Sequence, residues 1–261
     1  MKVLIFDTKA QAIGRVVEVI SRQLRDKGDS VLGLATGGTM EPVYAGLIVA
    51  FAEGRVRFSD ATTFNLDEYV GLPADHACSY ASFMQQRLFS QVDMDLARAH
   101  LPNGSAPDPG LEAQRYEASI EQAGGIDLQL LGIGENGHIG FNEPTSSLGS
   151  STRIKTLTAK TLAANRQYFP QAEDMPRYAI TMGVGTILRS RSVVLLATGK
   201  AKSTAVAAMV EGPVSARCPA SALQFHPDVT VILDRDASAA LELVDYYSAV
   251  HPGGQEADLA S

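Results

Sequence analysis

The sequence predicts a single α/β domain whose doubly wound, mostly parallel sheet carries helices on both faces, a Rossmann-like three-layer sandwich. Short apolar runs alternate with longer amphipathic segments along the chain, which is typical of strands connected by helices. The 261 residues, of which 45% are hydrophobic and 20% charged, suit one large globular domain. We expect this domain to span residues 1–251 and the tail at residues 252–261 to be frayed.

Six short runs rich in apolar and β-branched residues predict the strands of this sheet. They lie at residues 3–6, 31–36, 61–66, 126–133, 192–198 and 229–234. The segment 10–28 predicts a helix, because one of its faces is apolar and Gly28 stops it. That face is formed by Ile13, Val16, Val17, Ile20 and Leu24. Further helices are expected at residues 40–54, 79–92, 111–125 and 199–212.

The composition argues against several classes of function. With 22 basic and 29 acidic residues the formal charge is −7, which does not suit binding to nucleic acid. The apolar run at the amino end is short, and no stretch approaches the ~20 apolar residues that cross a membrane. Cys78 and Cys218 lie far apart, so we expect idle thiols in a reducing compartment and a cytoplasmic protein.

Polar groups and glycines collect in the loops that follow the predicted strands. Ligands of such sheets bind outside the carboxyl ends of the strands, which makes these loops the candidate site. The loop GIGENGHIGFNEP, residues 132–144, brings Asn136, His138 and Glu143 close together in sequence. An imidazole beside a carboxylate can transfer protons near neutral pH, whereas the alternative is a histidine with a purely structural hydrogen bond. No ligand spacing supports a metal site here.

Gly132, Gly134 and Gly137 in the same loop spell the G-x-G-x-x-G pattern of dinucleotide-binding proteins. That pattern belongs after the first strand, opens a long helix and is followed about 20 residues later by an acid. Here it follows roughly the fourth strand, Pro144 comes too soon, and KTLT (155–158) stands where the acid belongs. The context therefore argues against a nicotinamide cofactor.

Two further loops offer groups for an anion. Residues 36–39, TGGT, join a strand to a helix, so Thr36, Gly37, Gly38 and Thr39 could hold a phosphate near unpaired N–H groups. A tight turn without a ligand is the alternative. The sequence GKAK (199–202) puts lysines near a helix start, where they oppose the helix dipole unless an anion lies between. A pair of exposed lysines is the alternative reading of that loop.

The adjacent acids Asp67 and Glu68 follow the third predicted strand. In extended backbone their side chains point to opposite sides, so one can enter the crevice as a general base while the other faces outward or caps a helix. The alternative is that both are solvated loop acids.

Taken in order, the motifs ATGGT, FNLDEYVGL, GIGENGHIGFNEP, TRIKTLT, ITMGVGTIL and GKAK resemble those of the glucosamine-6-phosphate deaminases, in a wider group that includes the 6-phosphogluconolactonases. The resemblance runs from about residue 31 to residue 234. It implies conversion of D-glucosamine 6-phosphate to D-fructose 6-phosphate and ammonia without a cofactor. The GFNEP ending favours the deaminase branch, because the lactonases are expected to show a different histidine loop.

The resemblance also implies roles for single residues. Asp67 would take the C2 proton of the open-chain sugar, and His138 would move a proton between O5 and O1 during ring opening. Glu143 and Asn136 would support His138. The phosphate would lie against Thr36, Gly37, Gly38 and Thr39, with Lys202 as its cation.

Two parts of the resemblance are incomplete. Relatives use an arginine in the helix after TRIKTLT, but that register falls on Gln167 here. Arg166 comes one residue early, a rotation of about 100° on a helix. Arg153 and Lys155 match a region that forms an allosteric anion site in some members, where subunit neighbours would have to complete it.

Other functions stay open at this point. Galactosamine 6-phosphate needs only one changed sugar contact, and 6-phosphogluconolactone hydrolysis uses a similar fold with a histidine base. A sugar-phosphate sensor would not need Asp67 and His138 together. We expect an amino-sugar phosphate as the partner, no nucleic acid and no membrane, with a homo-oligomer possible.

Overall fold

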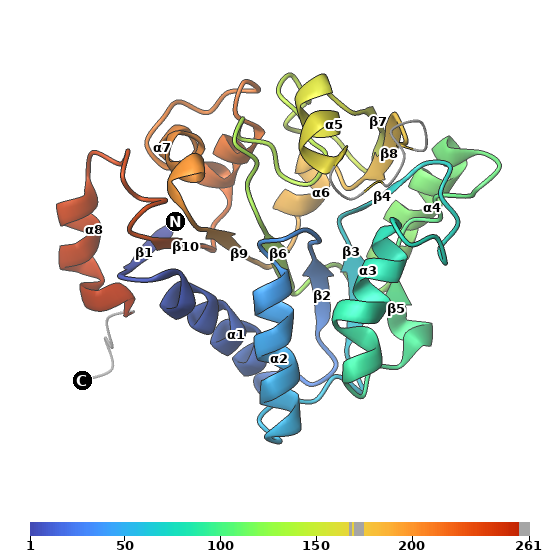
Figure 1. Ribbon diagram of the computed structural model, residues 1–261, viewed down its shortest axis with the longest axis horizontal. Helices are drawn as coiled ribbons and strands as arrows, with labels where there is room; N and C mark the ends of the chain where they lie inside the picture. Colours follow the sequence, from blue (N-terminus) through green and yellow to red (C-terminus); the bar gives the residue numbers. More distant parts are fainter. Residues whose placement is uncertain (167–168, 170–174, 256–261) are drawn as a thin grey trace.

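A parallel sheet of seven strands forms the middle layer of the fold, and helices cover both faces (Figure 1). The computed structural model describes residues 1–166, 169 and 175–255. The strand order is β1-β10-β9-β6-β2-β3-β5. The bounds of these strands are β1 (Lys2–Phe6), β2 (Val31–Leu34), β3 (Thr62–Asn65), β5 (Ala99–His100), β6 (Leu128–Leu131), β9 (Ser192–Ala197) and β10 (Val229–Asp234). The predicted fold class and all six predicted strands are confirmed, and β5 is an addition at the edge.

Helices connect the strands as the sequence pattern indicates, although several end earlier than expected. The α-helices are α1 (Lys9–Asp26), α2 (Glu41–Ala52), α3 (Tyr80–Arg87), α4 (Pro109–Gln122), α5 (Ala159–Asn165), α6 (Val184–Leu188), α7 (Ser203–Val210) and α8 (Val244–Val250). Short 3₁₀ turns are η1 (Phe89–Gln91), η2 (Leu96–Arg98), η5 (Lys200–Lys202), η6 (Pro219–Phe225) and η7 (Pro252–Gly254). The segment expected as one helix at 199–212 is thus a 3₁₀ turn followed by α7.

Local sequence explains where helix α1 begins and which of its faces is buried. Thr8 accepts a hydrogen bond from the Gln11 amide, and the Gln11 side chain accepts one from the Thr8 amide, which forms a capping box. The apolar stripe turns its buried members toward the sheet and α2. Gly46 in α2 permits this contact, because a Cβ there would lie 2.6 Å from Val17. Helix α1 therefore packs directly on α2 and on the strands.

A second sheet of three antiparallel strands, β4-β8-β7, lies beside the main one. Its strands are β4 (Asp67–Tyr69), β7 (Arg153–Thr156) and β8 (Tyr178–Thr181). The chain passes from β3 into β4 through Leu66, whose carbonyl accepts a hydrogen bond from Met182. This passage carries Asp67 from the main sheet to the small one, at the carboxyl edge where ligands bind.

The start of the tail is ordered against the first strand. Gly254 is buried on the Phe6 ring, where a Cβ would lie 2.6 Å from the nearest ring carbon. Residues 252–255, which we expected to fray, therefore pack against β1, and residues 256–261 lie outside the described residues. Cys78 and Cys218 form no disulfide bond. Within the described chain, no helix is long and apolar enough to cross a membrane.

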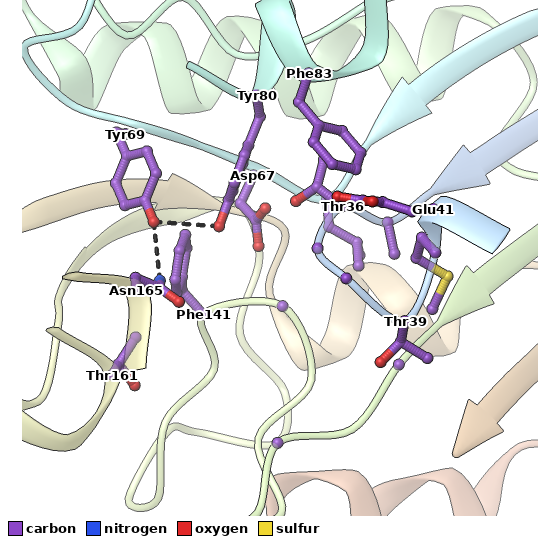
Figure 2. Close-up of a pocket in the computed structure, with 18 of the residues that line it drawn as sticks. Thr36, Thr39, Glu41, Asp67, Tyr69, Tyr80, Phe83, Phe141, Thr161 and Asn165 are labelled. Atoms are coloured by element: carbon purple, nitrogen blue, oxygen red, sulfur yellow. Dashed lines mark hydrogen bonds between the residues drawn. The ribbon is translucent and has the colours of Figure 1, made fainter. Parts of the chain in front are cut away.

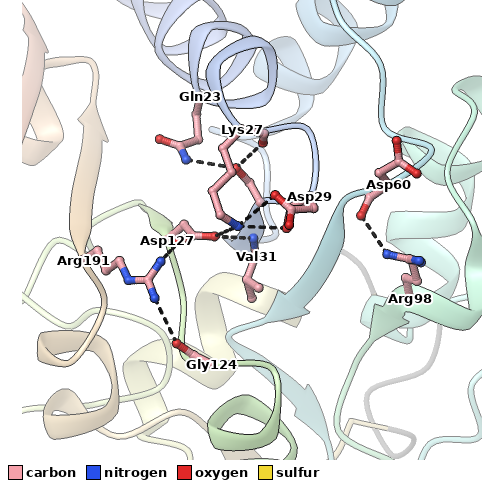
Figure 3. A network of polar contacts seen from close by, with 10 residues as sticks. Gln23, Lys27, Asp29, Val31, Asp60, Arg98, Gly124, Asp127 and Arg191 are labelled. Atoms are coloured by element: carbon pink, nitrogen blue, oxygen red, sulfur yellow. Dashed lines mark hydrogen bonds and ion pairs between the residues drawn. The ribbon is translucent and has the colours of Figure 1, made fainter.

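A buried acid connects several elements at the edge of the sheet where the parallel strands begin (Figure 3). Asp127, just before β6, accepts hydrogen bonds from the Val31 amide at 2.8 Å and from Lys27 Nζ at 2.9 Å, and it also pairs with Arg191. Burial alone would raise the pKa of Asp127, but the Val31 amide and Lys27 together hold it below its usual range. One carboxylate thus links α1, β2, β6 and β9 at the edge opposite the candidate site.

We predict that Asp127→Asn lowers the free energy of unfolding by about 1–3 kcal/mol, because an amide cannot replace this charge-assisted network. The folded pKa lies below the unfolded one, so this stabilisation is present above about pH 4 and is lost in stronger acid. Urea unfolding at several pH values measures it. Asp29→Asn, an exposed partner of the same lysine, is the control. Equal effects of the two substitutions would contradict the prediction.

Candidate active site

A cavity of about 500 Å³ opens at the carboxyl ends of the parallel strands (Figure 2). Its walls come from the loops after β2, β3, β6 and β9, together with α3 and α5. The crevice expected from the strand–helix alternation therefore exists at the expected edge. Thr36, Gly37, Gly38, Thr39 and Lys202 all line this cavity.

The turn at residues 36–39 bends sharply from β2 into α2. Gly37 has a φ of +100°, a left-handed conformation that favours glycine, and its carbonyl accepts the Met40 amide at 2.9 Å. The buried Tyr44 hydroxyl donates to the Ala35 carbonyl and anchors the turn from inside the helix. The start of α2 thereby faces the cavity, as an anion site requires.

Lys202 reaches the same cavity from the loop after β9. Gly199, with a φ of +85°, turns the chain there, and its amide donates to both carboxylate oxygens of Asp234 at 3.0 Å. The 3₁₀ turn η5 then places Lys202 directly before α7. A cation is therefore held beside the start of a helix, which favours an anion between them.

The adjacent acids Asp67 and Glu68 are both buried, so the reading of solvated loop acids is wrong. Asp67 is 5% exposed and lines the cavity, whereas Glu68 is 2% exposed and points to α3. There Glu68 accepts amide hydrogen bonds from Tyr69, Tyr80 and Ala81 at 2.8–3.0 Å. The predicted split between a crevice acid and a helix cap is confirmed.

Burial dominates the electrostatics of Asp67. Desolvation and then the neighbouring Glu68 charge raise the pKa of Asp67 to about 8, and the Phe141 amide opposes them only in part. This carboxyl group therefore holds its proton at neutral pH. Gly140 leaves room for it, since a Cβ there would lie 3.2 Å from Asp67 Oδ2.

His138, Asn136 and Glu143 form one hydrogen-bonded unit. Asn136 Nδ2 donates to Glu143 Oε2 at 2.8 Å, and Asn136 Oδ1 lies 2.6 Å from His138 Nδ1. His138 Nδ1 is also 3.6 Å from Glu143 Oε2. Burial alone would raise the pKa of Glu143, but hydrogen bonds from His138, Thr161 and Asn136 lower it to about 2. Glu143 is therefore ionised, and the His138 side chain, 25% exposed, lines the cavity above it.

Two glycines of the G-x-G-x-x-G pattern, Gly134 and Gly137, allow the close packing of the loop that carries His138. A Cβ on Gly134 would lie 2.2 Å from the His138 ring, and the Gly134 amide donates to the His138 carbonyl at 2.9 Å. Gly137 has a φ of +82° and lies against Cys218. The pattern thus allows the loop to fold under the imidazole.

The site also contains residues that the sequence reading missed. Tyr69 accepts a hydrogen bond from Asn165 Nδ2 at 2.8 Å and lies 3.3 Å from the Tyr80 hydroxyl, as the dashed lines in Figure 2 show. Thr161 donates to Glu143. Tyr69 lies inside the FNLDEYVGL motif and could have been noticed, but Thr161 and Asn165 carry no sequence signal.

Three predicted cations lie outside the lining of the cavity. Arg166 follows α5 with an exposed side chain and is not among the described residues of the cavity wall, while Gln167 lies outside the described residues. Arg153 and Lys155 share one face of β7, and neither lines the cavity. Burial lowers the pKa of Arg153, and its Nη2 has no hydrogen-bond partner.

Metal ligands do not gather in this structure. Among the residues that it describes, no group of three or more His, Cys, Asp or Glu is placed to hold a metal ion. His226 lies apart from the cavity, buried with its Nε2 2.8 Å from the Ser190 carbonyl oxygen.

A protonated acid and an imidazole that share a cavity with a glycine turn at the start of a helix are typical of enzymes that move protons on small anionic substrates. Comparison with known families defines the class more closely. Residues 7–232 match the family described as glucosamine-6-phosphate isomerases/6-phosphogluconolactonase. The chain therefore belongs to this family.

Relatives of the chain cover nearly its whole length. It is 54% identical to a glucosamine-6-phosphate deaminase of Hahella chejuensis, over 95% of this chain and 94% of the relative. It is 50% identical to the glucosamine-6-phosphate deaminase of Cellvibrio japonicus, over 98% of this chain and 97% of the relative. A solved monomeric glucosamine-6-phosphate deaminase is 44% identical with a TM-score of 0.90, over 92% of this chain and 100% of that one. A 6-phosphogluconolactonase from Trypanosoma cruzi, 20% identical with a TM-score of 0.74 over 92% and 97%, shares the fold.

We predict that Asp67→Asn stabilises the protein, and increasingly so as the pH rises. The folded pKa of Asp67 lies above the ordinary 3.8, so stability falls as the pH rises from 3.8 to about 8, and an amide removes this titration. Urea unfolding at about pH 4, 6 and 8 measures the difference between variant and parent. Asp75→Asn, at an exposed acid of the loop before α3, is the control. A difference that stays constant over this range would contradict the prediction.

Proposed function

We propose that the chain is a glucosamine-6-phosphate deaminase that converts D-glucosamine 6-phosphate and water to D-fructose 6-phosphate and ammonia. The observation that carries the proposal is the meeting of Asp67, the His138 unit and the 36–39 turn in one cavity. The relatives that bear this name support it, because they match along nearly the whole chain.

The phosphate is the group by which the cavity would hold the substrate. It would lie against the 36–39 turn and the start of α2, with Lys202 as a counter-charge. Holding one end of a flexible open-chain sugar places C2 at a set distance from that end, so phosphate binding contributes to the reaction at C2.

Ring opening would be the task of His138. Because Glu143 is ionised, Asn136 turns its amide nitrogen to Glu143 and its oxygen to His138 Nδ1. The proton of a neutral His138 is therefore on Nδ1, and Nε2 can take the proton of the O1 hydroxyl. Returning that proton to O5 breaks the C1–O5 bond and leaves an aldehyde at C1.

Deamination would then begin at Asp67. Without a cation beside it the carboxyl group is protonated, but the substrate carries an ammonium group on C2, and a neighbouring cation lowers a carboxyl pKa. The ionised Asp67 takes the C2 proton, and the electron pair forms an enolate at O1. A proton then passes from the ammonium group to O1, which leaves an enolamine. Asp67 returns its proton to C1, the nitrogen lone pair forms an iminium at C2, and water converts the iminium to the ketone and ammonia. The route uses no cofactor.

One assay separates this function from its rivals. Ammonia and fructose 6-phosphate are measured with glucosamine 6-phosphate, and ammonia also with galactosamine 6-phosphate. Hydrolysis of the lactone is measured with 6-phosphogluconolactone as the third substrate. Lactone hydrolysis without ammonia release would overturn the proposal, and a preference for the galacto epimer would change the substrate. The lactonase is less favoured, because its chemistry needs no buried acid beside C2.

The proposal also includes a cellular setting and a regulatory site. We place the protein in the cytoplasm, because the reaction concerns a phosphorylated sugar and Cys78 and Cys218 form no disulfide bond. Arg153 and Lys155 stay candidates for a second, regulatory anion site on β7. A homo-oligomer would be needed to complete that site.

We predict that Asp67→Asn binds glucosamine 6-phosphate yet exchanges no C2 hydrogen with solvent, because an amide cannot accept the proton. NMR of the substrate in D₂O measures the exchange, and calorimetry measures the binding. Asp75→Asn is again the control, with exchange as in the parent protein. Exchange that continues in Asp67→Asn would remove Asp67 from this role.

A second prediction concerns the glycine under the imidazole. Gly134→Ala should lower kcat/KM on the order of 10²-fold, because the new Cβ displaces the His138 ring. The fold should remain, since the φ of Gly134 is not in the left-handed region. Gly14→Ala in α1 is the matched control, because a Cβ there meets nothing within 4 Å. Full activity of Gly134→Ala would contradict the arrangement.

A further inference from the structure

Helix α3 brings an arginine to the cavity that the sequence motifs did not single out. Arg87 is the last residue of α3, and it lines the cavity together with Phe83, one helical turn earlier on the same face. Among the described residues of the cavity wall, Arg87 and Lys202 are the two with permanently cationic side chains. Arg166, which lies one residue before the register of the family's arginine, is absent from that wall.

Two contacts fix helix α3, which carries Arg87 at its end. Glu68 binds the first amides of α3, and the Phe83 ring packs edge-on against Tyr44 of α2 with ring centroids 6.4 Å apart. Tyr44 in turn anchors the 36–39 turn. Figure 2 shows Phe83 and Glu41 with Thr36 and Thr39 at this end of the cavity. Helix α3 is therefore fixed relative to the turn that would hold the phosphate.

The partner of Arg87 lies next to that turn. Arg87 Nη2 is 3.7 Å from Glu41 Oε1, and Glu41 is the first residue of α2, two residues after Thr39. The side chains are 52% and 38% exposed, so the pair is loose and contributes little to stability. A phosphate at the start of α2 would offer the guanidinium a doubly charged partner with matching geometry.

The charges that line the cavity favour a second cation for the phosphate. Glu41 and Glu135 are acids of the lining, against Lys202 and Arg87, while Asp67 holds its proton. A dianionic phosphate beside Glu41 would be repelled unless a cation lay between them.

We propose that Arg87 is a substrate-binding residue that leaves Glu41 to bind the phosphate group, so that Lys202 and Arg87 hold it together. This inference rests on the proposed function for the identity of the substrate. It assigns the phosphate contact to α3 in place of Arg166.

The test compares Arg87→Gln with the parent protein in the ammonia assay and in competition with inorganic phosphate. We expect KM for glucosamine 6-phosphate and the inhibition constant of phosphate to rise about tenfold, with kcat nearly unchanged. Arg87→Lys keeps the positive charge but loses the bidentate guanidinium group. Its KM and its inhibition constant for phosphate should therefore lie between those of the parent and of Arg87→Gln. Glu41→Gln should lower KM severalfold, and this gain should vanish when Arg87 is also replaced.

Arg22→Gln is the matched control, because Arg22 forms a similar exposed pair with Asp26 at 3.6 Å on α1, away from the cavity. Unchanged KM and phosphate inhibition in Arg87→Gln would overturn the inference, as would a loss of kcat alone. If Arg87→Gln does not fold, a parent-like KM in Arg87→Lys together with no effect of Glu41→Gln would overturn it. Should the parent release no ammonia, the proposed function fails. Calorimetry of phosphate binding to the same variants then still decides the role of Arg87.

Discussion

Two adjacent carboxyl groups are buried where the main sheet passes into the small one, and the rest of the site depends on how each is accommodated. The backbone stays extended from β3 into β4, so Asp67 and Glu68 must face opposite ways. Glu68 receives three amide hydrogen bonds and holds the start of α3. Asp67 has far fewer compensating donors, so it keeps its proton. One short strand therefore supplies the acid of the cavity and holds the start of α3, which forms part of the cavity wall.

The second carboxyl group of the chemistry is placed in the opposite way. Glu143 accepts hydrogen bonds from Asn136 and Thr161 and lies near His138, which keeps it ionised although it is as buried as Asp67. Two carboxyl groups with pKa values pushed apart can serve different steps at one pH. The neutral Asn136 between His138 and Glu143 avoids a second acid in this cluster and sets the direction of its hydrogen bonds.

Most of the main sheet could be predicted because its strands are buried on both faces and read as apolar runs. The small sheet could not, since β4 has three residues and pairs with β8 more than a hundred residues later. Pairing over such a separation leaves no local pattern. The same holds for α5, which contacts the site through Thr161 and Asn165. It holds also for Arg87, whose access to the cavity depends on where α3 packs.

The sequence by itself determined which loops line the cavity, because the order of strands and helices decides which segments reach the carboxyl edge of a parallel sheet. It also determined the residues of the 36–39 turn and of the His138 unit, which lie close together along the chain. Only the tertiary structure decided which acid is protonated, which cation reaches the cavity and which does not. Those properties depend on desolvation and on contacts between distant segments, and neither is written in the spacing of residues along one segment.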